Sequence, residues 1–361
     1  MLYRKYRPQT FAEVIGQDHV IKTLRGALTT GRIGHAYLFC GPRGTGKTTI
    51  ARLLAKALSC EKRTREGDCD DSCRNCTAIK DGRSLDLIEI DAASNRGIDE
   101  VRNLKESALV AAPGGGFKVF IIDEVHMLTT PAFNALLKIL EEPPAHVVFI
   151  LATTEPHKII PTVLSRVQRF DFKRLSSAQI LEKLLGIAKQ EKINIDKEGL
   201  TAIDVSSGGA LRDAEVALSK IKAANPPDAK ITADKVVSLL GLIPFSYHPE
   251  FLGHILNGNK AEAIGLINKI YESGIDSEYF ASEFIDYLRK ILMFKVNPAT
   301  LVSIGEGLID SETKLIASYA GVLDPQKLIK IITVFVSARD TIKSSPIPQL
   351  PLELAVLELL Q

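Results

Sequence analysis

The chain has 361 residues, of which 45% are hydrophobic and 24% are charged. At roughly 150 residues per domain, this length predicts two or three domains, and the composition excludes a disordered or fibrous protein. Charges interrupt the apolar stretches well before the roughly 18 residues that a membrane span requires, so we expect no membrane role. Lysine and arginine number 45 against 43 acidic residues, so any contact with nucleic acid must come from a local basic patch.

Short apolar runs alternate with helical patterns over the first 172 residues. The runs are rich in β-branched and aromatic residues and lie at 36–40, 85–91, 118–123 and 147–152, and a further strand is expected at 168–172. Such alternation is typical of an α/β fold, with a parallel sheet covered by helices on both faces. Between the runs at 118–123 and 147–152, residues 131–141 have apolar side chains at helical spacing, and Pro143 ends that helix.

Beyond residue 172 the strand signals disappear. Helical patterns at 176–190, 198–205 and 210–222 predict a small all-α domain over 173–240. The pattern stays helical over 241–361 and becomes richer in large apolar residues, which predicts a second all-α domain. One helix face there is expected to carry Phe280, Phe284, Leu288 and Ile291.

A glycine-rich segment follows the run at 36–40 and precedes a helical pattern. It fits the phosphate-binding loop G-x-x-x-x-G-K-[ST], whose backbone N–H groups turn toward phosphates at a helix N-terminus. Lys47 would reach the β- and γ-phosphates, and the Thr48 hydroxyl would bind Mg²⁺. An ordinary glycine-rich turn is the alternative. The residues expected to contact the nucleotide are Gly41, Gly44, Thr45, Gly46, Lys47, Thr48 and Thr49.

Polar side chains follow two of the predicted strands. Asp123 ends the run at 118–123 and Glu124 follows it, and ligands bind at the carboxyl ends of strands in open parallel sheets. Asp123 would hold Mg²⁺, Glu124 would orient the attacking water, and Thr154 would sense the γ-phosphate. Solvated carboxylates and an ordinary strand threonine are the alternatives, but the phosphate-binding loop favours catalysis.

Two arginines stand at predicted element boundaries. Arg166 precedes the strand at 168–172, so its guanidinium can reach outward, and Arg212 begins a helix that could fold back onto the nucleotide. A surface salt bridge is the alternative for either residue.

These segments together resemble the bacterial DNA polymerase III clamp-loader subunits gamma and tau over essentially the whole chain. The matching blocks are 6–11, 14–17, 41–48, 123–128, 137–144, 152–156, 165–166 and 211–214. The resemblance implies an AAA+ P-loop ATPase domain at 1–172, a helical lid at 173–240 and a helical collar at 241–361 that assembles the ring.

The same resemblance implies roles for individual residues. Arg166 looks like a finger acting in trans on the γ-phosphate of a neighbouring subunit, and Arg212 looks like the sensor of the lid. Val167 replaces the cysteine that usually follows this arginine in the family. The nucleotide is expected to be ATP, because no guanine-reading motif is seen. The residues that would surround adenine and ribose are Tyr6, Arg7, Val14, Ile15 and Gly16.

The resemblance also implies partners. A five-subunit ring would contain delta, delta-prime and further gamma/tau copies, and would use ATP to open the beta sliding clamp and admit primed DNA. Arg96, Arg102 and Lys105 are candidates for contacts to DNA phosphates, with a solvated helix face as the alternative. Two other functions are a branch-migration motor, which should carry a winged-helix domain, and a non-catalytic scaffold, which the intact motifs disfavour.

Four of the five cysteines lie in the insertion at 60–76, namely Cys60, Cys69, Cys73 and Cys76. The basic first segment lacks a secretory signal, so we expect the reducing cytoplasm, where metal ligation is favoured over disulfides. Four thiolates suit a structural tetrahedral Zn²⁺ site, and reduced surface thiols are the alternative. Three residues separate Cys69 from Cys73, where family members usually have two.

Overall fold

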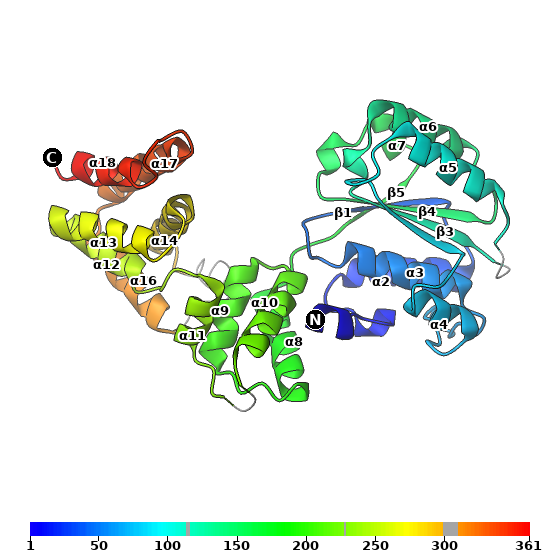
Figure 1. Cartoon of the computed structure of the whole chain (residues 1–361), viewed down its shortest axis with the longest axis horizontal. Helices are drawn as coiled ribbons and strands as arrows, with labels where there is room; N and C mark the ends of the chain where they lie inside the picture. The colour runs from blue at the N-terminus through cyan, green and yellow to red at the C-terminus, as the bar shows by residue number, and fades with distance from the viewer. Residues whose placement is uncertain (113–115, 227–228, 299–309) are drawn as a thin grey trace. The chain divides into compact units, whose positions relative to one another are not determined.

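The computed structural model describes residues 1–112, 116–226, 229–298 and 310–361 (Figure 1). The described residues form two compact units. The first comprises Met1–Leu175 and Gly209–Glu215, and the second comprises Ser176–Gly208 and Val216–Gln361. The three-domain division at residues 172 and 240 stays a prediction. None of the described helices combines the length and the apolar character needed to cross a membrane.

The first unit is built on a five-stranded parallel sheet. Its strands are β1 (Ala36–Cys40), β2 (Leu87–Asp91), β3 (Lys118–Asp123), β4 (Val147–Thr153) and β5 (Gln168–Asp171). They pair in the order β2-β3-β4-β1-β5, and every pair is parallel. The central strands β1, β3 and β4 are buried almost throughout, which explains why their sequences are continuously apolar rather than alternating.

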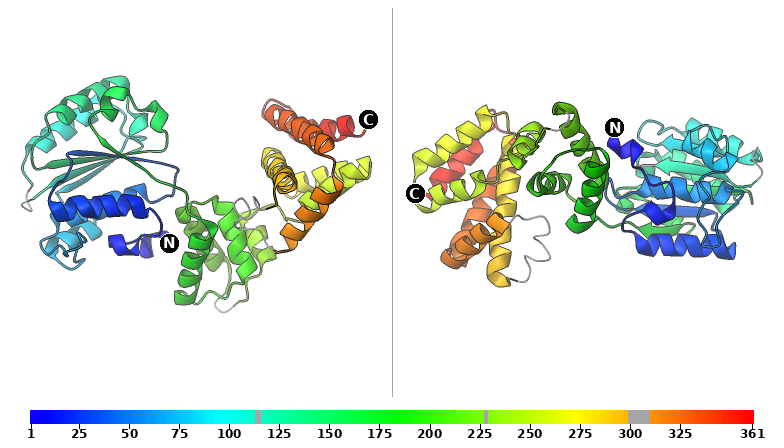
Figure 2. Two further views of the ribbon diagram at one scale, coloured as in Figure 1. Left: turned by 180° about the vertical axis from the view of Figure 1, so that it is seen from behind. Right: turned by 90° about the horizontal axis from the view of Figure 1, so that it is seen from below.

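Helices cover both faces of this sheet (Figures 1 and 2). On one face, α2 (Asp18–Thr30) and α3 (Lys47–Ser59) share a core with Phe39 and Ile150. On the other, α5 (Ile98–Leu109) and α6 (Thr130–Glu141) share a core with Leu38 and Phe149. Adjacent strand residues thus serve opposite faces, as the β pleat requires. The predicted fold class, a parallel sheet with helices on both faces, is confirmed.

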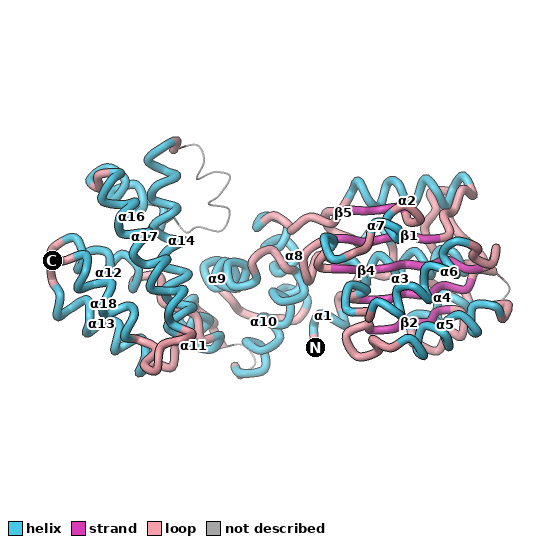
Figure 3. The backbone as a smooth tube through the Cα atoms, turned by 90° about the horizontal axis from the view of Figure 1, so that it is seen from above, coloured by secondary structure: helices cyan, strands magenta, loops and turns pink. Residues whose placement is uncertain are grey.

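Shorter helices connect these elements. They are α1 (Leu2–Lys5), η1 (Phe11–Glu13), α4 (Arg74–Lys80), η2 (Val125–Met127), η3 (Pro156–Lys158) and α7 (Pro161–Leu164). Because β4 lies between β1 and β3, the carboxyl ends of these three strands meet at one edge of the sheet (Figure 3). The phosphate-binding loop, the acidic pair and Thr154 each follow one of these ends.

The second unit is helical, as predicted. Its described helices are α8 (Ser177–Gln190), α9 (Lys197–Ser207), the later part of α10 (Leu211–Ala224), α11 (Ala233–Leu240), α12 (Tyr247–Leu256), α13 (Lys260–Glu272), α14 (Ser277–Val296), α16 (Asp310–Val322), α17 (Pro325–Ile342) and α18 (Leu350–Leu359). Phe280, Phe284, Leu288 and Ile291 are fully buried in the core that the described helices α12, α13, α14, α16, α17 and α18 share. The predicted apolar face of this helix is confirmed.

Candidate nucleotide site and cysteine cluster

The phosphate-binding loop connects β1 to α3. Gly41, Gly44 and Gly46 have φ angles of 149°, 78° and 97°, a region that side chains other than glycine rarely adopt. A Cβ atom at Gly41 would also lie 2.5 Å from the carbonyl oxygen of Phe172. Among the described residues no side chain caps α3, so the N–H groups of its first turn are available to an anion.

Lys47 is folded into this loop. Its side chain is 6% exposed, and its Nζ donates to the carbonyl oxygens of Gly41 at 2.7 Å and of Pro42 at 2.8 Å. Burial lowers the pKa of Lys47, and the carboxylates of Glu124 and Asp123 oppose that shift. The ammonium is therefore desolvated and held by carbonyl oxygens, which phosphate oxygens could replace.

Three of the predicted catalytic segments meet beside the loop. The Thr48 hydroxyl donates to Asp123 Oδ2 at 2.8 Å. Glu124 Oε2 accepts from the Thr154 hydroxyl at 2.9 Å and from the Thr154 N–H at 3.3 Å. The strand order explains this meeting, because these residues follow the adjacent ends of β1, β3 and β4.

His126 completes this polar group, and no role was predicted for it. Its side chain is 5% exposed, and its Nδ1 lies 3.4 Å from Glu124 Oε2 and 3.0 Å from the Thr153 hydroxyl. Its Nε2 lies 3.0 Å from Glu155 Oε2. The imidazole thus connects the acidic pair to Glu155, whose pKa is lowered by a hydrogen bond from Lys158. The signal that could have identified it is its position two residues after the acidic pair.

One cleft of the first unit collects most of the predicted nucleotide-binding residues. Tyr6, Gly16 and Gly41 do not line it, whereas Tyr3, Leu175 and Leu211, which were not predicted, do. The guanidinium carbon of Arg212 lies 5.1 Å from the centroid of the Tyr3 ring, a distance typical of a cation–π contact. The predicted residues that line the cleft are Arg7, Val14, Ile15, Gly44, Thr45, Gly46, Lys47, Thr48, Thr49, Asp123, Glu124 and Arg212.

Arg166 lies elsewhere on the first unit. It lines a separate surface hollow with His35 and Leu140, and its guanidinium donates to Glu141 Oε1 at 2.8 Å and to the carbonyl oxygen of Thr162 at 2.7 Å. It is therefore not part of the cleft that the phosphate-binding loop of its own chain forms.

The candidate DNA-binding residues are exposed, Arg96 just before α5 and the other two within it. Arg96 Nε donates to the carbonyl oxygen of Ala93 at 2.9 Å, and Arg102 pairs with Asp99 at 2.9 Å. Lys105 is also exposed. Their contact with DNA stays a prediction.

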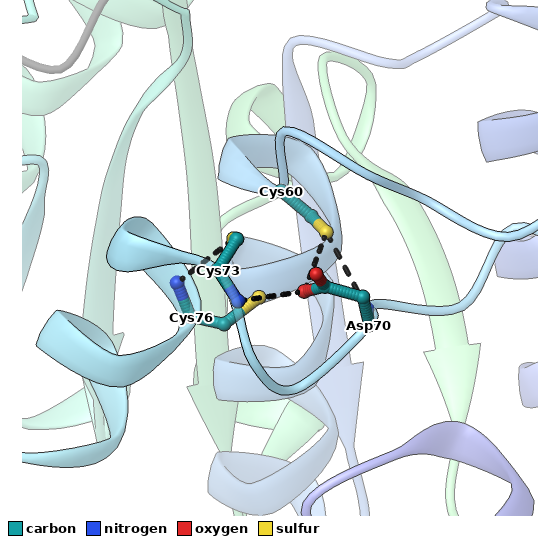
Figure 4. Close-up of side chains that lie close together, drawn as sticks. All are labelled: Cys60, Asp70, Cys73 and Cys76. Atoms are coloured by element: carbon teal, nitrogen blue, oxygen red, sulfur yellow. Dashed lines mark hydrogen bonds between the residues drawn. The ribbon is translucent and has the colours of Figure 1, made fainter.

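Three of the four predicted metal ligands come together with an aspartate. One donor atom from each of Cys60, Asp70, Cys73 and Cys76 lies within 4.8 Å of the other three (Figure 4). Tetrahedral zinc with Zn–S bonds of about 2.3 Å requires donors roughly 3.8 Å apart, so a small closure of this group fits the ion. Cys69 is not among these four donors, and its Sγ lies 3.5 Å from the carbonyl oxygen of Gln9. The structure therefore differs from the predicted four-cysteine set.

Cys40 is separate from the insertion. It lies in β1 and is 1% exposed. Burial raises its thiol pKa to about 11, which suits an inert core residue.

Comparisons with known proteins find DNA polymerase III subunits along most of the chain. A profile of the DNA polymerase III delta subunit matches residues 16–176, and a profile of domain III of DNA polymerase III subunits gamma and tau matches residues 231–361. The tau subunit of Bacillus subtilis is 37% identical over 360 residues, which are 100% of this chain and 63% of that protein. The gamma subunit of Buchnera aphidicola is 40% identical over 294 residues, which are 81% of this chain and 80% of that protein.

Other relatives are longer than this chain. The tau subunit of Escherichia coli is 42% identical over 301 residues, which are 83% of this chain and 46% of that protein. The chain thus spans about half to just under two thirds of the tau subunits that it matches. Among solved structures, the RuvB branch-migration motor of Thermotoga maritima is 17% identical, with a TM-score of 0.48 over 69% of this chain and 79% of that one. A likeness of this size says nothing about function.

Proposed function

Because the chain belongs to the family of bacterial DNA polymerase III gamma and tau subunits, we propose that it is an ATPase subunit of a clamp loader. The observation that carries the proposal is the meeting of the phosphate-binding loop with Thr48, Asp123, Glu124 and Thr154 at one edge of the sheet. Such a meeting supplies the groups for phosphate binding and for water activation in one place.

In this proposal the phosphates of ATP lie against the loop and the N-terminus of α3. Lys47 exchanges the carbonyl oxygens of Gly41 and Pro42 for phosphate oxygens, which are anionic and bind an ammonium more strongly. Thr48 and Asp123 would hold Mg²⁺, because hydroxyl and carboxylate oxygens are its preferred protein ligands. When bound, Mg²⁺ neutralises charge on the phosphates.

Hydrolysis needs an oriented water beside the γ-phosphate. Glu124 accepts the proton of that water, and the hydroxyl and N–H of Thr154 orient the carboxylate from which Glu124 acts. Arg7, Val14 and Ile15 would lie against adenine and ribose. Arg212, near the start of α10, would act as the sensor of the bound phosphates.

The second half of the catalytic site comes from a neighbouring subunit. Arg166 would reach the γ-phosphate of the next chain, so ATP would bind both chains and stabilise their assembly. The ring would contain five subunits, including delta and delta-prime, and would open the beta sliding clamp on primed DNA in the cytoplasm. Residues 1–172 would be the AAA+ domain, 173–240 the lid and 241–361 the collar.

The insertion at 60–76 would hold a structural Zn²⁺ ion. Three thiols and a carboxylate form a closed donor set, and a site without an open position suits a structural role. The ion would stabilise the conformation of a loop that contains little secondary structure.

The central test is nucleotide binding by the whole chain. Replacing Lys47 with alanine should weaken binding of an ATP analogue about 10- to 100-fold, since one or two charge-assisted hydrogen bonds to phosphate are lost. Lys22→Ala, on the exposed face of α2, is the matched control and should bind normally. Equal binding by all three proteins would contradict the proposed site.

Stimulation of turnover then separates the clamp loader from other ATPases. ATPase activity should rise when delta, delta-prime, the sliding clamp and primed DNA are added together. Stimulation by branched DNA without the clamp would instead indicate a branch-migration motor.

A further inference from the structure

Building on the zinc site proposed above, we infer that Asp70, and not Cys69, is its fourth ligand. The metal would then be held by three thiolates and one carboxylate, with Cys60, Cys73 and Cys76 supplying the sulfur atoms. Carboxylate oxygens bind zinc at about 2.0–2.2 Å, so such a donor set is chemically ordinary. Four observations on the loop between α3 and α4 carry the inference.

The first observation is the spacing of two consecutive turns. Two residues separate Asp70 from Cys73, and two separate Cys73 from Cys76. In the first turn the Cys73 N–H donates to Asp70 Oδ1 at 3.1 Å, and in the second the Cys76 N–H donates to Cys73 Sγ at 3.4 Å. The Asp70 carboxylate therefore occupies in its turn the place that the Cys73 sulfur occupies in the next one.

The second observation is the direct contact between Asp70 and Cys60. The Asp70 N–H donates to Cys60 Sγ at 3.4 Å, and the Cys60 thiol lies 3.4 Å from Asp70 Oδ1. In Figure 4 the side chains of Cys60, Asp70, Cys73 and Cys76 converge on one point, from the end of α3, from the loop and from the start of α4. Hydrogen bonds from backbone and neighbouring groups of this kind hold metal ligands in orientation.

The third observation is the anchoring of Asp68 and Cys69 to the N-terminal segment. The carboxylate of Asp68 accepts hydrogen bonds from the N–H groups of Phe11 at 3.1 Å, Ala12 at 3.2 Å and Cys69 at 2.9 Å. The Cys69 thiol packs against the other cysteines, but its Sγ lies against the carbonyl oxygen of Gln9. Turning the thiol into the site would break this contact with the N-terminal segment.

The fourth observation explains the additional residue between Cys69 and Cys73. Asp71 has a φ of 55°, and its carboxylate pairs with Lys56, whose side chain is 3% exposed. A left-handed conformation costs a non-glycine residue about 1–2 kcal/mol, and the ion pair with a buried lysine offsets that cost. This arrangement fixes which residue faces the cluster, and that residue is Asp70.

The experiment measures metal binding by the full chain without reference to ATPase activity. Wild type, Cys69→Ala, Asp70→Ala and the control Asp81→Ala are titrated with Zn²⁺ against a colorimetric chelator after removal of bound metal. Asp81 is a suitable control because it is a nearby carboxylate, directly after α4, that pairs with Arg83 instead. We expect Cys69→Ala to keep its zinc affinity within about threefold and Asp70→Ala to lose more than about tenfold, the smallest loss seen even for residues that only support a ligand.

A second measurement needs no loss of a ligand. In the Co²⁺-substituted protein, the sulfur-to-metal charge-transfer absorption grows with the number of thiolates. Wild type should show the intensity of three thiolates, and Asp70→Cys should add one. The same spectrum from Cys69→Ala as from wild type would support Asp70.

Loss of zinc from Cys69→Ala, or a four-thiolate spectrum from wild type, would overturn the assignment of Asp70 while leaving the proposed zinc site intact. Absence of stoichiometric zinc from wild type and from Asp81→Ala would instead remove the zinc site itself. The two failures are therefore distinguishable.

Discussion

Glu124 is the residue on which the proposed chemistry depends most closely. Its backbone has a φ of 48°, a left-handed conformation that costs about 1–2 kcal/mol for a residue with a side chain. Its Oε2 accepts two hydrogen bonds from Thr154 and lies 3.4 Å from His126 Nδ1. The carboxylate is therefore held in one orientation before any nucleotide binds.

Replacing Thr154 with valine tests whether this orientation serves catalysis. Valine keeps the shape of the side chain but removes the hydroxyl that donates to Glu124 at 2.9 Å. We expect the kcat for ATP hydrolysis to fall about 10- to 100-fold, the equivalent of one hydrogen bond to a charged group, while the affinity for ATP changes little. Steady-state kinetics and analogue binding measure the two effects separately.

Thr29→Val, on the exposed end of α2, is the control for the substitution itself and should keep the wild-type kcat. A normal kcat in Thr154→Val would mean that Glu124 does not depend on this hydroxyl. A parallel fall in affinity and kcat would instead assign Thr154 to nucleotide binding.

Individual site residues differ in how far the sequence predicts them. Lys47 and Asp123 are predictable because a strand, a loop and a helix must follow one another in a fixed order around them. Tyr3 and His126 are not, because each reaches the site through tertiary contacts that leave no spacing pattern. The exchange of Cys69 for Asp70 depends on the ion pair of Asp71 with Lys56, which ligand spacing alone does not reveal.

At the scale of elements, the packing of α12 against α14 buries a histidine. His248 is 6% exposed, and its ring stacks on Phe280 and Tyr287 at centroid distances of 6.0 and 5.8 Å. Its Nε2 has no hydrogen-bond partner within the described part of the chain. Burial, with a smaller contribution from the Lys290 ammonium and an opposing one from Asp286, lowers the pKa of His248 to about 4.

This burial makes the helical unit sensitive to mild acid. The folded pKa lies below the unfolded value of about 6.5, so the stabilisation is present above pH 6.5 and is lost as the pH falls toward 4. Between pH 7.5 and 5.5 the free energy of unfolding should fall by about 1 kcal/mol through this group. Urea unfolding followed by circular dichroism at the two pH values measures the loss.

His248→Phe should remove this part of the pH dependence, because phenylalanine can stack on the same rings and carries no titratable nitrogen. His254→Phe, whose parent side chain is 23% exposed on the same helix, is the matched control and should keep the wild-type slope. The same pH dependence in wild type and His248→Phe would contradict the assignment.

The sequence predicts those strands and helices whose apolar patterns extend over enough residues to be recognised. The buried strands β1, β3 and β4 were predicted within one residue of their ends, because two covered faces leave an unbroken apolar run. Helices α1 and α4 have four and seven residues, too few turns for an apolar period to be recognised. Their contacts are tertiary instead, because Tyr3 of α1 lines the cleft and Cys76 of α4 lies in the cysteine cluster.

At the scale of the whole molecule, the position of Arg166 bears on how one chain would act on its neighbour in an assembled ring. It does not line the cleft of its own chain, and it pairs with Glu141. The two side chains are 32% and 50% exposed, so the pair is worth at most about 1 kcal/mol. Exchanging Glu141 for the γ-phosphate of a neighbouring chain would therefore cost little. Residue patterns within one chain do not reveal such a contact, and here only the family resemblance suggested it.

The substitution Arg166→Ala should accordingly reduce ATP hydrolysis only in the assembled ring. Ring ATPase turnover should fall at least about 1000-fold, the lower end for a trans-acting arginine, while ATP binding and the slow turnover of the isolated chain stay unchanged. Arg169→Ala, which removes an exposed arginine paired with Asp171 at 2.7 Å, is the control. An equal fall in the isolated chain would show that Arg166 acts in cis.

Mixed rings provide the sharper form of this test. A Lys47→Ala chain still offers Arg166 to its neighbour, and an Arg166→Ala chain still offers an intact phosphate-binding loop. Rings that contain both variants should therefore recover turnover at those interfaces where the two intact halves meet, whereas rings of either variant alone should not. If mixing restores nothing although ring assembly is normal, Arg166 and Lys47 do not serve one shared site, and the trans role of Arg166 is wrong.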